Sequence, residues 1–269
     1  MKVVDGDLHL ILQEDNKHMS QTKKGKVIGV DIDALDWDDV LNIMHNWAIN
    51  RESRYLCMCN VHSAVTAGNN KEFASVLAQA DLVTPDGGPI AKMLTLLGFP
   101  NQQRINGPDL MWKYCEEASQ RDESIYLFGG RQSTLDKLQI NLKKYFPSLK
   151  IAGSYSPPFR ALTEEEDAKI INDINLSGAN TVWVSLGCPK QEKWMLSHRG
   201  KINAVMIGVG AAFEYHAGDL SRAPKWMQNA SLEWLFRLYK QPGYLWRRYL
   251  FTNTTFIYRA TKQLIFKKN

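Results

Sequence analysis

The stretch Ala80-Asp81-Leu82-Val83-Thr84-Pro85-Asp86-Gly87-Gly88-Pro89 decides the fold. Residues 82–84 form an apolar run typical of a short buried strand, which Pro85 ends. Gly87 and Gly88 favour a turn, and Pro89 favours the start of a helix over residues 90–97, because the first helical position needs no N–H donor. Asp86 is therefore expected at the carboxyl end of a strand, where ligands bind in an open α/β sheet. A simpler hypothesis is that Asp86 only caps the helix and the glycines only serve the turn.

On both sides of this stretch, strand-like runs alternate with helix-like runs. Strands are expected over residues 26–30, 54–59, 82–84, 124–128, 149–152, 181–186 and 204–208. Helices are expected after residue 36, from residue 60, over residues 71–80, 90–97, 109–119 and 133–145, and within 161–176. This alternation predicts an α/β fold with a Rossmann-like, mainly parallel sheet, helices on both faces, and a site along one rim.

We expect three parts in the chain: an N-terminal extension (1–25), the Rossmann-like α/β domain (26–222) and a basic, aromatic helical appendage (223–269). The net charge of the whole chain is +5, yet from Trp234 onward it has eight Lys and Arg residues and no Asp or Glu. Five apolar residues of this tail are expected on one side of a helix: Trp246, Leu250, Phe256, Ile257 and Leu264. Such a segment favours contact with an anionic membrane surface over nucleic acid. The alternative is a helix that packs on its own domain or on a sister subunit.

The sequence predicts a cytoplasmic protein. Acidic residues interrupt the N-terminal segment, which therefore lacks the apolar core of a signal peptide. No apolar run approaches the roughly 20 residues that span a bilayer. The four cysteines, Cys57, Cys59, Cys115 and Cys188, form no zinc-type pair of CxxC motifs and are expected as reduced, mostly buried thiols.

Two glycine pairs bear on nucleotide binding. Gly129-Gly130 and Gly208-Val209-Gly210 follow predicted strands and would let backbone N–H groups approach a phosphate. Tight packing between strand and helix explains such glycines equally well. Neither pair completes a GxGxxG motif followed by a well-placed acidic residue, so NAD binding is not expected.

Asp31 and Asp33 have the spacing of a short metal-binding motif. A strand end followed by a turn explains both residues better, because such a motif means little without its structural context. We expect neither a metal nor another cofactor.

Seven ordered segments carry a further signal. They are residues 60–67 and 80–87, Arg104-Ile105-Asn106-Gly107-Pro108-Asp109-Leu110, Tyr126-Leu127-Phe128-Gly129-Gly130, Gly187-Cys188-Pro189-Lys190-Gln191-Glu192, Gly208-Val209-Gly210-Ala211-Ala212-Phe213, and Arg222-Ala223-Pro224 with Leu232-Glu233-Trp234-Leu235-Phe236-Arg237. From about residue 27 to the tail, the chain resembles the WecG/TagA/CpsF glycosyltransferases (glycosyltransferase family 26).

This resemblance implies an inverting, metal-independent transfer of a sugar from a UDP-sugar to a saccharide on a membrane polyprenyl diphosphate. The pathway implied is cell-surface polysaccharide biosynthesis, such as that of exopolysaccharide. The sugar implied is N-acetylmannosamine, its uronic acid or glucose. The place implied is the inner face of the cell membrane, with peripheral attachment.

The resemblance also implies roles for single residues. Asp86 is the expected general base, which takes the proton from the acceptor hydroxyl. Asn60 is expected to help hold the donor sugar or the acceptor, Arg104 to stabilise phosphate or orient the base, and Gln191 to contact the sugar. Glu214 stands where the family commonly has Asp and is expected near the uracil.

Arg237 and Arg247 match tail arginines that are expected to fold over the leaving diphosphate, whose developing charge cationic side chains stabilise. The chain departs from the family pattern at two positions. Met58 replaces a Thr, and Tyr244 replaces a further Arg, for which Arg248 could substitute.

Other hypotheses stay open at this point. One is a non-catalytic module of the same fold that binds a UDP-sugar or a lipid surface, and another is a nucleotide-sugar-modifying enzyme such as an epimerase. Taken singly, Arg104 also fits a surface ion pair and Gln191 a polar residue at a helix start. His62 and His216 are expected to be structural. The sequence leaves homo-oligomerisation open.

Overall fold

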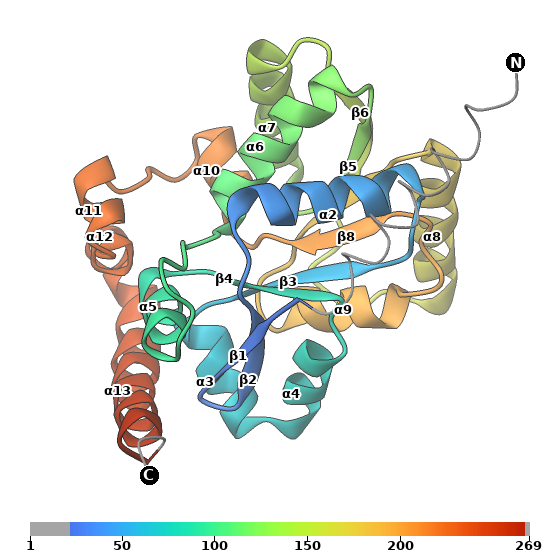
Figure 1. Cartoon of the computed structure of the whole chain (residues 1–269). Coiled ribbons are helices and arrows are strands. Elements are labelled where there is room, and N and C mark those ends of the chain that lie inside the picture. The colour runs from blue at the N-terminus through green and yellow to red at the C-terminus, as the bar shows by residue number, and fades with distance from the viewer. Residues whose placement is uncertain (1–21, 267–269) are drawn as a thin grey trace, which may run out of the picture.

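The computed structural model describes residues 22–266, with the side chain of Tyr244 outside the described part. Figure 1 shows a central sheet with helices on both sides. The sheet has six strands in the order β4-β3-β8-β7-β5-β6, and every neighbouring pair is parallel. The strands are β3 (Tyr55–Cys59), β4 (Leu82–Pro85), β5 (Ser124–Gly129), β6 (Lys150–Tyr155), β7 (Thr181–Ser185) and β8 (Val205–Gly208). The parallel α/β sheet predicted from the sequence is confirmed.

Two apolar cores lie against the two faces of the sheet, because neighbouring residues of a strand point to opposite sides. In β7, Val182 and Val184 belong to one core and Trp183 to the other. The first core is covered by α3 (Val61–Asn69), α4 (Lys71–Ala78), α5 (Gly88–Leu96), α8 (Glu164–Ser177) and α9 (Lys190–His198). The second is covered by α2 (Trp37–Ile49), α6 (Gly107–Gln120), α7 (Gln132–Tyr145) and α10 (Ala212–Ala217). Strands buried on both sides explain the nearly continuous apolar runs in the sequence.

Residues 26–30, expected as one strand, form part of a separate hairpin instead. β1 (Lys24–Val27) pairs antiparallel with β2 (Val30–Asp33), and the turn holds Ile28 at a φ of 42° and Gly29 at a φ of 99°. Positive φ at both turn residues matches the twist of a two-residue hairpin. The prediction of a single strand was wrong because the chain reverses at Gly29. Lys24 and Gly25, expected in the N-terminal extension, belong to β1, and residues 1–21 of that extension lie outside the described part.

The side chain of Asp33 is fully buried beside the outer edge of β4. Its Oδ2 accepts a hydrogen bond of 2.8 Å from the backbone N–H of Val83, and its Oδ1 accepts one from the hydroxyl of Thr22. Asp31 is exposed and pairs with Lys26 at 3.6 Å. Asp33 therefore supplies a hydrogen-bond acceptor to the backbone N–H of Val83, on the side of β4 where none of the described strands pairs. Within residues 22–266 no group of three or more His, Cys, Asp or Glu side chains is arranged to hold a metal.

Three helices form the C-terminal part: α11 (Lys225–Asn229), α12 (Glu233–Lys240) and α13 (Pro242–Phe266). They lie at the left of Figure 1. α13 packs along α3 and buries Leu245, Phe256 and Ala260. Gln263 accepts a hydrogen bond of 2.7 Å from Ile28 N and donates one of 2.5 Å to Lys26 O, so the helix also holds the hairpin turn.

The expected apolar side of α13 needs one correction. Leu250 and Ile257 are 62% and 64% exposed, whereas Phe256 is only 6% exposed. With 3.6 residues per turn, Phe256 lies roughly a third of a turn away from the other two and faces α3. Within residues 22–266 no helix combines the length and the apolar composition that crossing a membrane requires.

The remaining elements lie close to the predicted ranges, and Asp36 caps α2 as expected. Helices α9 and α10 were not predicted, because they are short and their apolar residues form no long repeating side, whereas α11 and α12 lie within the helical appendage expected over residues 223–269. Cys57, Cys59 and Cys115 are buried and free, as expected, and Cys188 is free and partly exposed.

Replacing Asp33 by Ala should lower the free energy of unfolding by about 1–3 kcal/mol, because the buried N–H of Val83 loses its acceptor. Thermal and urea unfolding measure this change. Asp31→Ala, which removes an exposed ion pair, is the matched control and should change stability by less than about 1 kcal/mol. Equal effects of the two substitutions would contradict the assigned role of Asp33.

Candidate active site

A cleft of about 1830 Å³ opens at the carboxyl ends of the parallel strands. The chain leaves β5 for α7 on one face of the sheet and leaves β7 for α9 on the other face. This divergence makes a crevice between the two strands, which is the usual ligand position in open α/β sheets. α12 and α13 line the same cleft, so it combines residues from distant parts of the chain.

Asp86 lines the cleft directly after β4. Its backbone N–H donates to Cys59 O at 2.9 Å, which ties its loop to the end of β3. Asn60 donates from Nδ2 to Asp86 Oδ2 at 3.2 Å, and its own Oδ1 caps α3 by accepting from Ser63 N at 3.1 Å. Asp86 does not cap α5, whose N-cap is Gly87 at a φ of 104° with no side-chain hydrogen bond. The simpler hypothesis for Asp86, a helix cap, is therefore wrong.

The charge on Asp86 is set by several neighbours. Burial raises the pKa of its carboxyl group above the usual value, and the hydrogen bond from Asn60 and the charge of Arg104 oppose this rise. The charge of Glu233 raises the pKa further, and that of Arg237 lowers it. A carboxylate with a raised pKa is a stronger base than an ordinary surface aspartate.

Arg104 lies next to Asp86 within a network of alternating charges. Its Nη1 donates to Glu233 Oε2 at 2.9 Å, and its Nη2 lies 4.0 Å from Asp109 Oδ2. Arg222 binds Asp109 through both of its Nη atoms, at 2.5 and 3.2 Å. Burial alone would raise the pKa of Asp109, but the hydrogen bonds from Arg222 and Asn106 lower it to about 2. Arg104 is thus part of a partly buried network and not a surface ion pair.

α12 approaches the Asp86 loop closely. A Cβ atom on Gly88 would lie 1.8 Å from Ser231 Oγ, just before α12, so only glycine permits this approach. Arg237, on α12, lines the cleft with its guanidinium 5.9 Å above the ring centroid of Tyr215. The helix therefore brings Glu233 to Arg104 and a cation to the space in front of Asp86.

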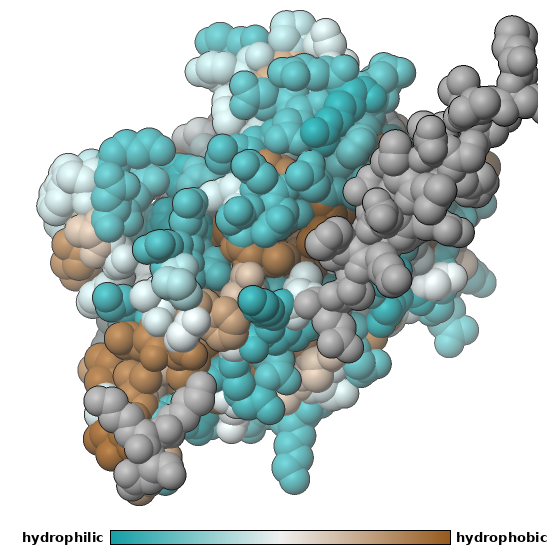
Figure 2. Space-filling view, in the orientation of Figure 1, coloured by the Kyte–Doolittle hydropathy of each residue, from teal (hydrophilic) through white to brown (hydrophobic). Residues whose placement is uncertain are grey.

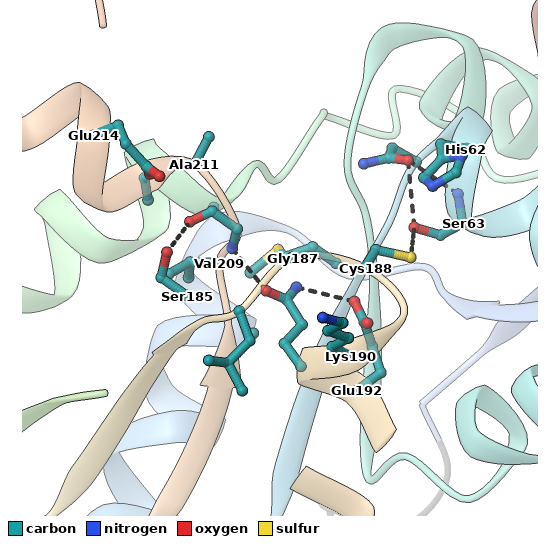
Figure 3. Close-up of a pocket in the computed structure, with 18 of the residues that line it drawn as sticks. His62, Ser63, Ser185, Gly187, Cys188, Lys190, Glu192, Val209, Ala211 and Glu214 are labelled. Atoms are coloured by element: carbon teal, nitrogen blue, oxygen red, sulfur yellow. Dashed lines mark hydrogen bonds between the residues drawn. The ribbon is translucent and has the colours of Figure 1, made fainter. Parts of the chain in front are cut away.

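Gln191 is buried in the cleft wall, and its amide group is engaged with the protein. Its Oε1 accepts from Gly210 N at 3.1 Å, and its Nε2 donates to Glu192 Oε1 at 2.9 Å. Ser185 Oγ donates to Gly210 O at 2.7 Å. Figure 3 shows these bonds in the wall of the pocket. Gln191 thus fixes the loop after β8, and its contact with a sugar stays a prediction.

Gly129, Gly130, Gly208 and Gly210 lie at strand ends beside the cleft. Some of their backbone N–H groups already donate hydrogen bonds within the protein. Gly130 N donates to Ser185 O at 3.0 Å. A Cβ atom on Gly129 would lie 2.3 Å from Ser185 O, and one on Gly208 would lie 2.8 Å from Met195 Cε. Close packing therefore accounts for Gly129 and Gly208, and protein oxygens take the N–H groups of Gly130 and Gly210.

Glu214, on α10, lines the end of the cleft near Ser185 (Figure 3). Its Oε2 is buried and has no hydrogen-bond partner among the described residues. Burial raises the pKa of its carboxyl group, and the charges of Arg237 and Arg131 oppose the rise. Glu214 therefore offers an unused acceptor to a ligand at this end.

The two tail arginines are not brought together. Arg237 lines the cleft, whereas Arg247 is exposed on α13, lies 5.2 Å from the ring centroid of Trp246 and does not line the cleft. Arg248 does line it. The side chain of Tyr244, where the family pattern has a further arginine, lies outside the described part.

Arg131 and Glu233 line the cleft and were given no role from the sequence. Arg131 stands at the N-cap position of α7 without a side-chain capping bond, and Glu233 holds Arg104. His62, expected to be structural, also lines the cleft, two residues after Asn60. His216 is structural as expected, with Nε2 2.8 Å from Pro108 O. Met58 accepts a 3.0 Å hydrogen bond at Sδ from the hydroxyl of Thr84, on the neighbouring strand.

Comparison with known proteins matches residues 25–269 to the model described as "Glycosyl transferase WecG/TagA/CpsF family". The chain is similar to the N-acetylglucosaminyldiphosphoundecaprenol N-acetyl-beta-D-mannosaminyltransferase of Bacillus spizizenii strain W23, with 30% identity over 226 residues that cover 81% of this chain and 86% of the relative. It is also similar to the proteins of the same name from Bacillus subtilis strain 168 (30% identity; 71% and 73% covered) and Staphylococcus aureus strain NCTC 8325 (25% identity; 81% and 85% covered).

Replacing Asn60 by Ser should raise the pKa of Asp86 further, because serine keeps the helix cap but loses the amide that stabilises the ionised carboxylate. Carbon-13 NMR titration of the Asp86 carboxyl group measures this shift. Asn70→Ser, which changes the N-cap of α4 without touching Asp86, is the control. An unchanged or lowered pKa in Asn60→Ser would contradict the assigned hydrogen bond.

Proposed function

Because the chain belongs to the WecG/TagA/CpsF family of glycosyltransferases, we propose that it transfers a sugar from a UDP-sugar to a saccharide carried on a polyprenyl diphosphate, with inversion at the anomeric carbon. The observation that supports this most is the Asp86–Asn60 pair in the cleft, with Arg237 on α12 close to the carboxylate. A base and a cation beside one cleft are what a direct displacement from a nucleotide diphosphate needs.

In the proposed reaction, the acceptor hydroxyl oxygen attacks the anomeric carbon of the donor. Asp86 takes the proton of that hydroxyl as the new C–O bond forms. The bond between the anomeric carbon and the β-phosphate oxygen breaks, and its electron pair leaves with UDP. Asn60 keeps one carboxylate oxygen in place, so the other is available to the hydroxyl.

The donor fits best at the end of the cleft that holds Glu214. Glu214 Oε2, which has no hydrogen-bond partner among the described residues, would accept a hydrogen bond from the uracil or the ribose. The charges of Arg237 and Arg131 both lower the pKa of Glu214, so a diphosphate beside Glu214 would also be attracted by these two cations. The first turn of α7 also lines the cleft, and a helix N-terminus favours an anion. These groups would stabilise the charge of leaving UDP without a metal.

The sugar we favour is N-acetylmannosamine, because the similar proteins are named for that transfer. N-acetylmannosaminuronic acid and glucose are the alternatives from the sequence. A panel of UDP-sugars, assayed for UDP release with a short prenyl-diphosphate-linked N-acetylglucosamine, distinguishes them. UDP release that does not depend on the acceptor would favour another nucleotide-sugar enzyme.

Asp86→Asn should lower the transfer rate at least about 100-fold, since general-base catalysis contributes that much or more. UDP binding, measured by calorimetry, should stay close to that of the unmodified chain. Asp122→Asn, which alters an exposed carboxylate paired with Lys150, is the matched control. Full activity of Asp86→Asn would refute the proposed base, and intact UDP binding with no transfer by the unmodified chain would favour a non-catalytic binding module.

We extend the proposal to peripheral binding at the inner face of the cell membrane. Apolar side chains are exposed along the C-terminal part, among them Tyr239, Leu250, Phe251 and Tyr258. Figure 2 shows a brown, apolar area over α13, at the lower left. Basic residues lie on the same helix, among them Arg247 and Lys262. Exposed apolar groups beside cations suit the headgroup region of an anionic bilayer.

Leu250→Asp combined with Phe251→Asp should lower partition onto phosphatidylglycerol vesicles at least about tenfold, because each exposed side chain would lose about 1.5 kcal/mol or more of burial in lipid. Vesicle co-sedimentation measures the partition. Ile140→Asp changes an equally exposed apolar residue on α7, away from the C-terminal part, and should have no such effect. Similar losses in both proteins would contradict membrane contact through α13.

A further inference from the structure

The cleft has two ends, and the reaction proposed above places the donor at only one of them. Figure 3 shows Glu214 and Ser185 at one end of the pocket and His62 and Ser63 at the other, with Gly187 and Cys188 between them. At this second end, residues of α3, α9 and α13 line the cleft. We call its polar side chains, His62, Lys190 and Arg248, the second-end cluster.

His62 brings a buried nitrogen without a partner to this end. Its Nδ1 is shielded from solvent and makes no hydrogen bond to any described residue. Burial, and then the charge of Arg248, lower the pKa of His62 to about 4. The ring is therefore neutral near pH 7, and one of its nitrogens carries a proton that it can donate.

Lys190 and Arg248 add positive charge beside this ring. Lys190 is exposed at the first turn of α9 and forms no ion pair within residues 22–266, whereas Lys193 on the same helix pairs with Glu72 at 2.7 Å. Glu192 lies in the same wall, buried and hydrogen-bonded to Gln191, and burial raises the pKa of its carboxyl group to about 6. Lys190 and Arg248 outnumber this carboxylate. The second end of the cleft is therefore a place where an anion is attracted.

The two ends have separate sets of cations. At the donor end, the charges of Arg237 and Arg131 lower the pKa of Glu214. At the second end, the charge of Arg248 lowers the pKa of His62. Because Glu214 and His62 lie at opposite ends of the pocket in Figure 3, a diphosphate beside one of them is held by one set of cations. Two anionic groups can therefore be held in the cleft at the same time.

Apolar side chains lead outward from the second-end cluster. Phe256 and Ile257 line the same cleft, and Ile257 is 64% exposed on α13. Leu250 lies on the same side of that helix, two turns earlier, and is 62% exposed. An anion joined to a long apolar chain would match this arrangement of charge and apolar surface.

We propose that the second-end cluster binds the diphosphate of the polyprenyl acceptor and that the prenyl chain leaves the cleft over Ile257. This assignment rests on the function proposed above. The acceptor saccharide then extends from the cluster towards Asp86, which Asn60 links to the turn of α3 that carries His62. The reacting hydroxyl lies between two diphosphates, each held by its own cations.

The test uses the full chain with a UDP-sugar and a short prenyl-diphosphate-linked N-acetylglucosamine. Lys190→Gln, which removes the positive charge, and His62→Phe, which removes the ring N–H donor, should each raise the KM for the acceptor roughly tenfold, as expected for the loss of one interaction with a charged group. The KM for the UDP-sugar and the affinity for UDP should stay unchanged. Lys193→Gln removes the same charge from the same helix outside the cleft and should leave all three values unchanged.

An acceptor with a monophosphate in place of the diphosphate gives a second, independent measurement. The unmodified chain should bind this analogue more weakly than the diphosphate, whereas the Lys190→Gln, His62→Phe double variant should discriminate much less. Equal discrimination by both proteins would overturn the assignment. A raised KM for the UDP-sugar with an unchanged acceptor KM would also overturn it.

Failure of the proposed function gives a different result, because the unmodified chain would then release no UDP with any donor. Equilibrium binding of the prenyl diphosphate to the unmodified chain and to the double variant still tests the cluster in that case, since binding requires no transfer. Equal affinities would refute the cluster, and weaker binding by the double variant would support it.

Discussion

The site depends on one carboxylate, Asp86, that is held partly out of water between fixed neighbours. Burial raises its pKa, and the amide of Asn60 and the charges of Arg104 and Arg237 keep the ionised form accessible. These partners come from the end of β3, the segment before α6, and α12. Because a buried charge without partners is costly, the fold has to bring three distant parts of the chain together before the carboxylate can act as a base. The parallel sheet does this for β3 and β4, whose carboxyl ends meet at one rim.

The sequence predicted the regular part of the fold because burial imposes a visible pattern there. Most strands of the six-stranded sheet are apolar on both faces, and most of the helices show a repeating apolar side, so the alternation of strand and helix could be inferred. The N-terminal hairpin was missed because the reversal depends on two residues, Ile28 and Gly29, with positive φ. Phe256 was placed on the wrong side of α13 because composition does not show which side of an aromatic helix meets the protein.

The site was harder to predict, since a residue type does not show what its polar atoms already bind. Gln191 lies in the cleft as expected, yet both ends of its amide group are engaged with the protein. Arg247 and Arg248 are neighbours in sequence, and the 100° between successive residues of a helix places only Arg248 in the cleft. His62 was expected to be structural because a lone histidine usually is, and the role proposed for it rests on its buried Nδ1, which has no partner among the described residues.

The C-terminal part lines one wall of the cleft and also exposes apolar side chains on the outside of the protein. Ser231 contacts Gly88, Glu233 binds Arg104, and α13 is fixed to α3 and to the hairpin turn through Gln263. Because these contacts join α12 and α13 firmly to the sheet, any surface that binds the exposed side of α13 also fixes the orientation of the cleft. A lipid-linked acceptor in that surface would then meet the cleft at its α13 end. The donor would enter from the other end, where the first turn of α7 and Glu214 lie. On the proposed function, the pair of α12 and α13 would align a membrane-linked substrate with Asp86 at the end of β4.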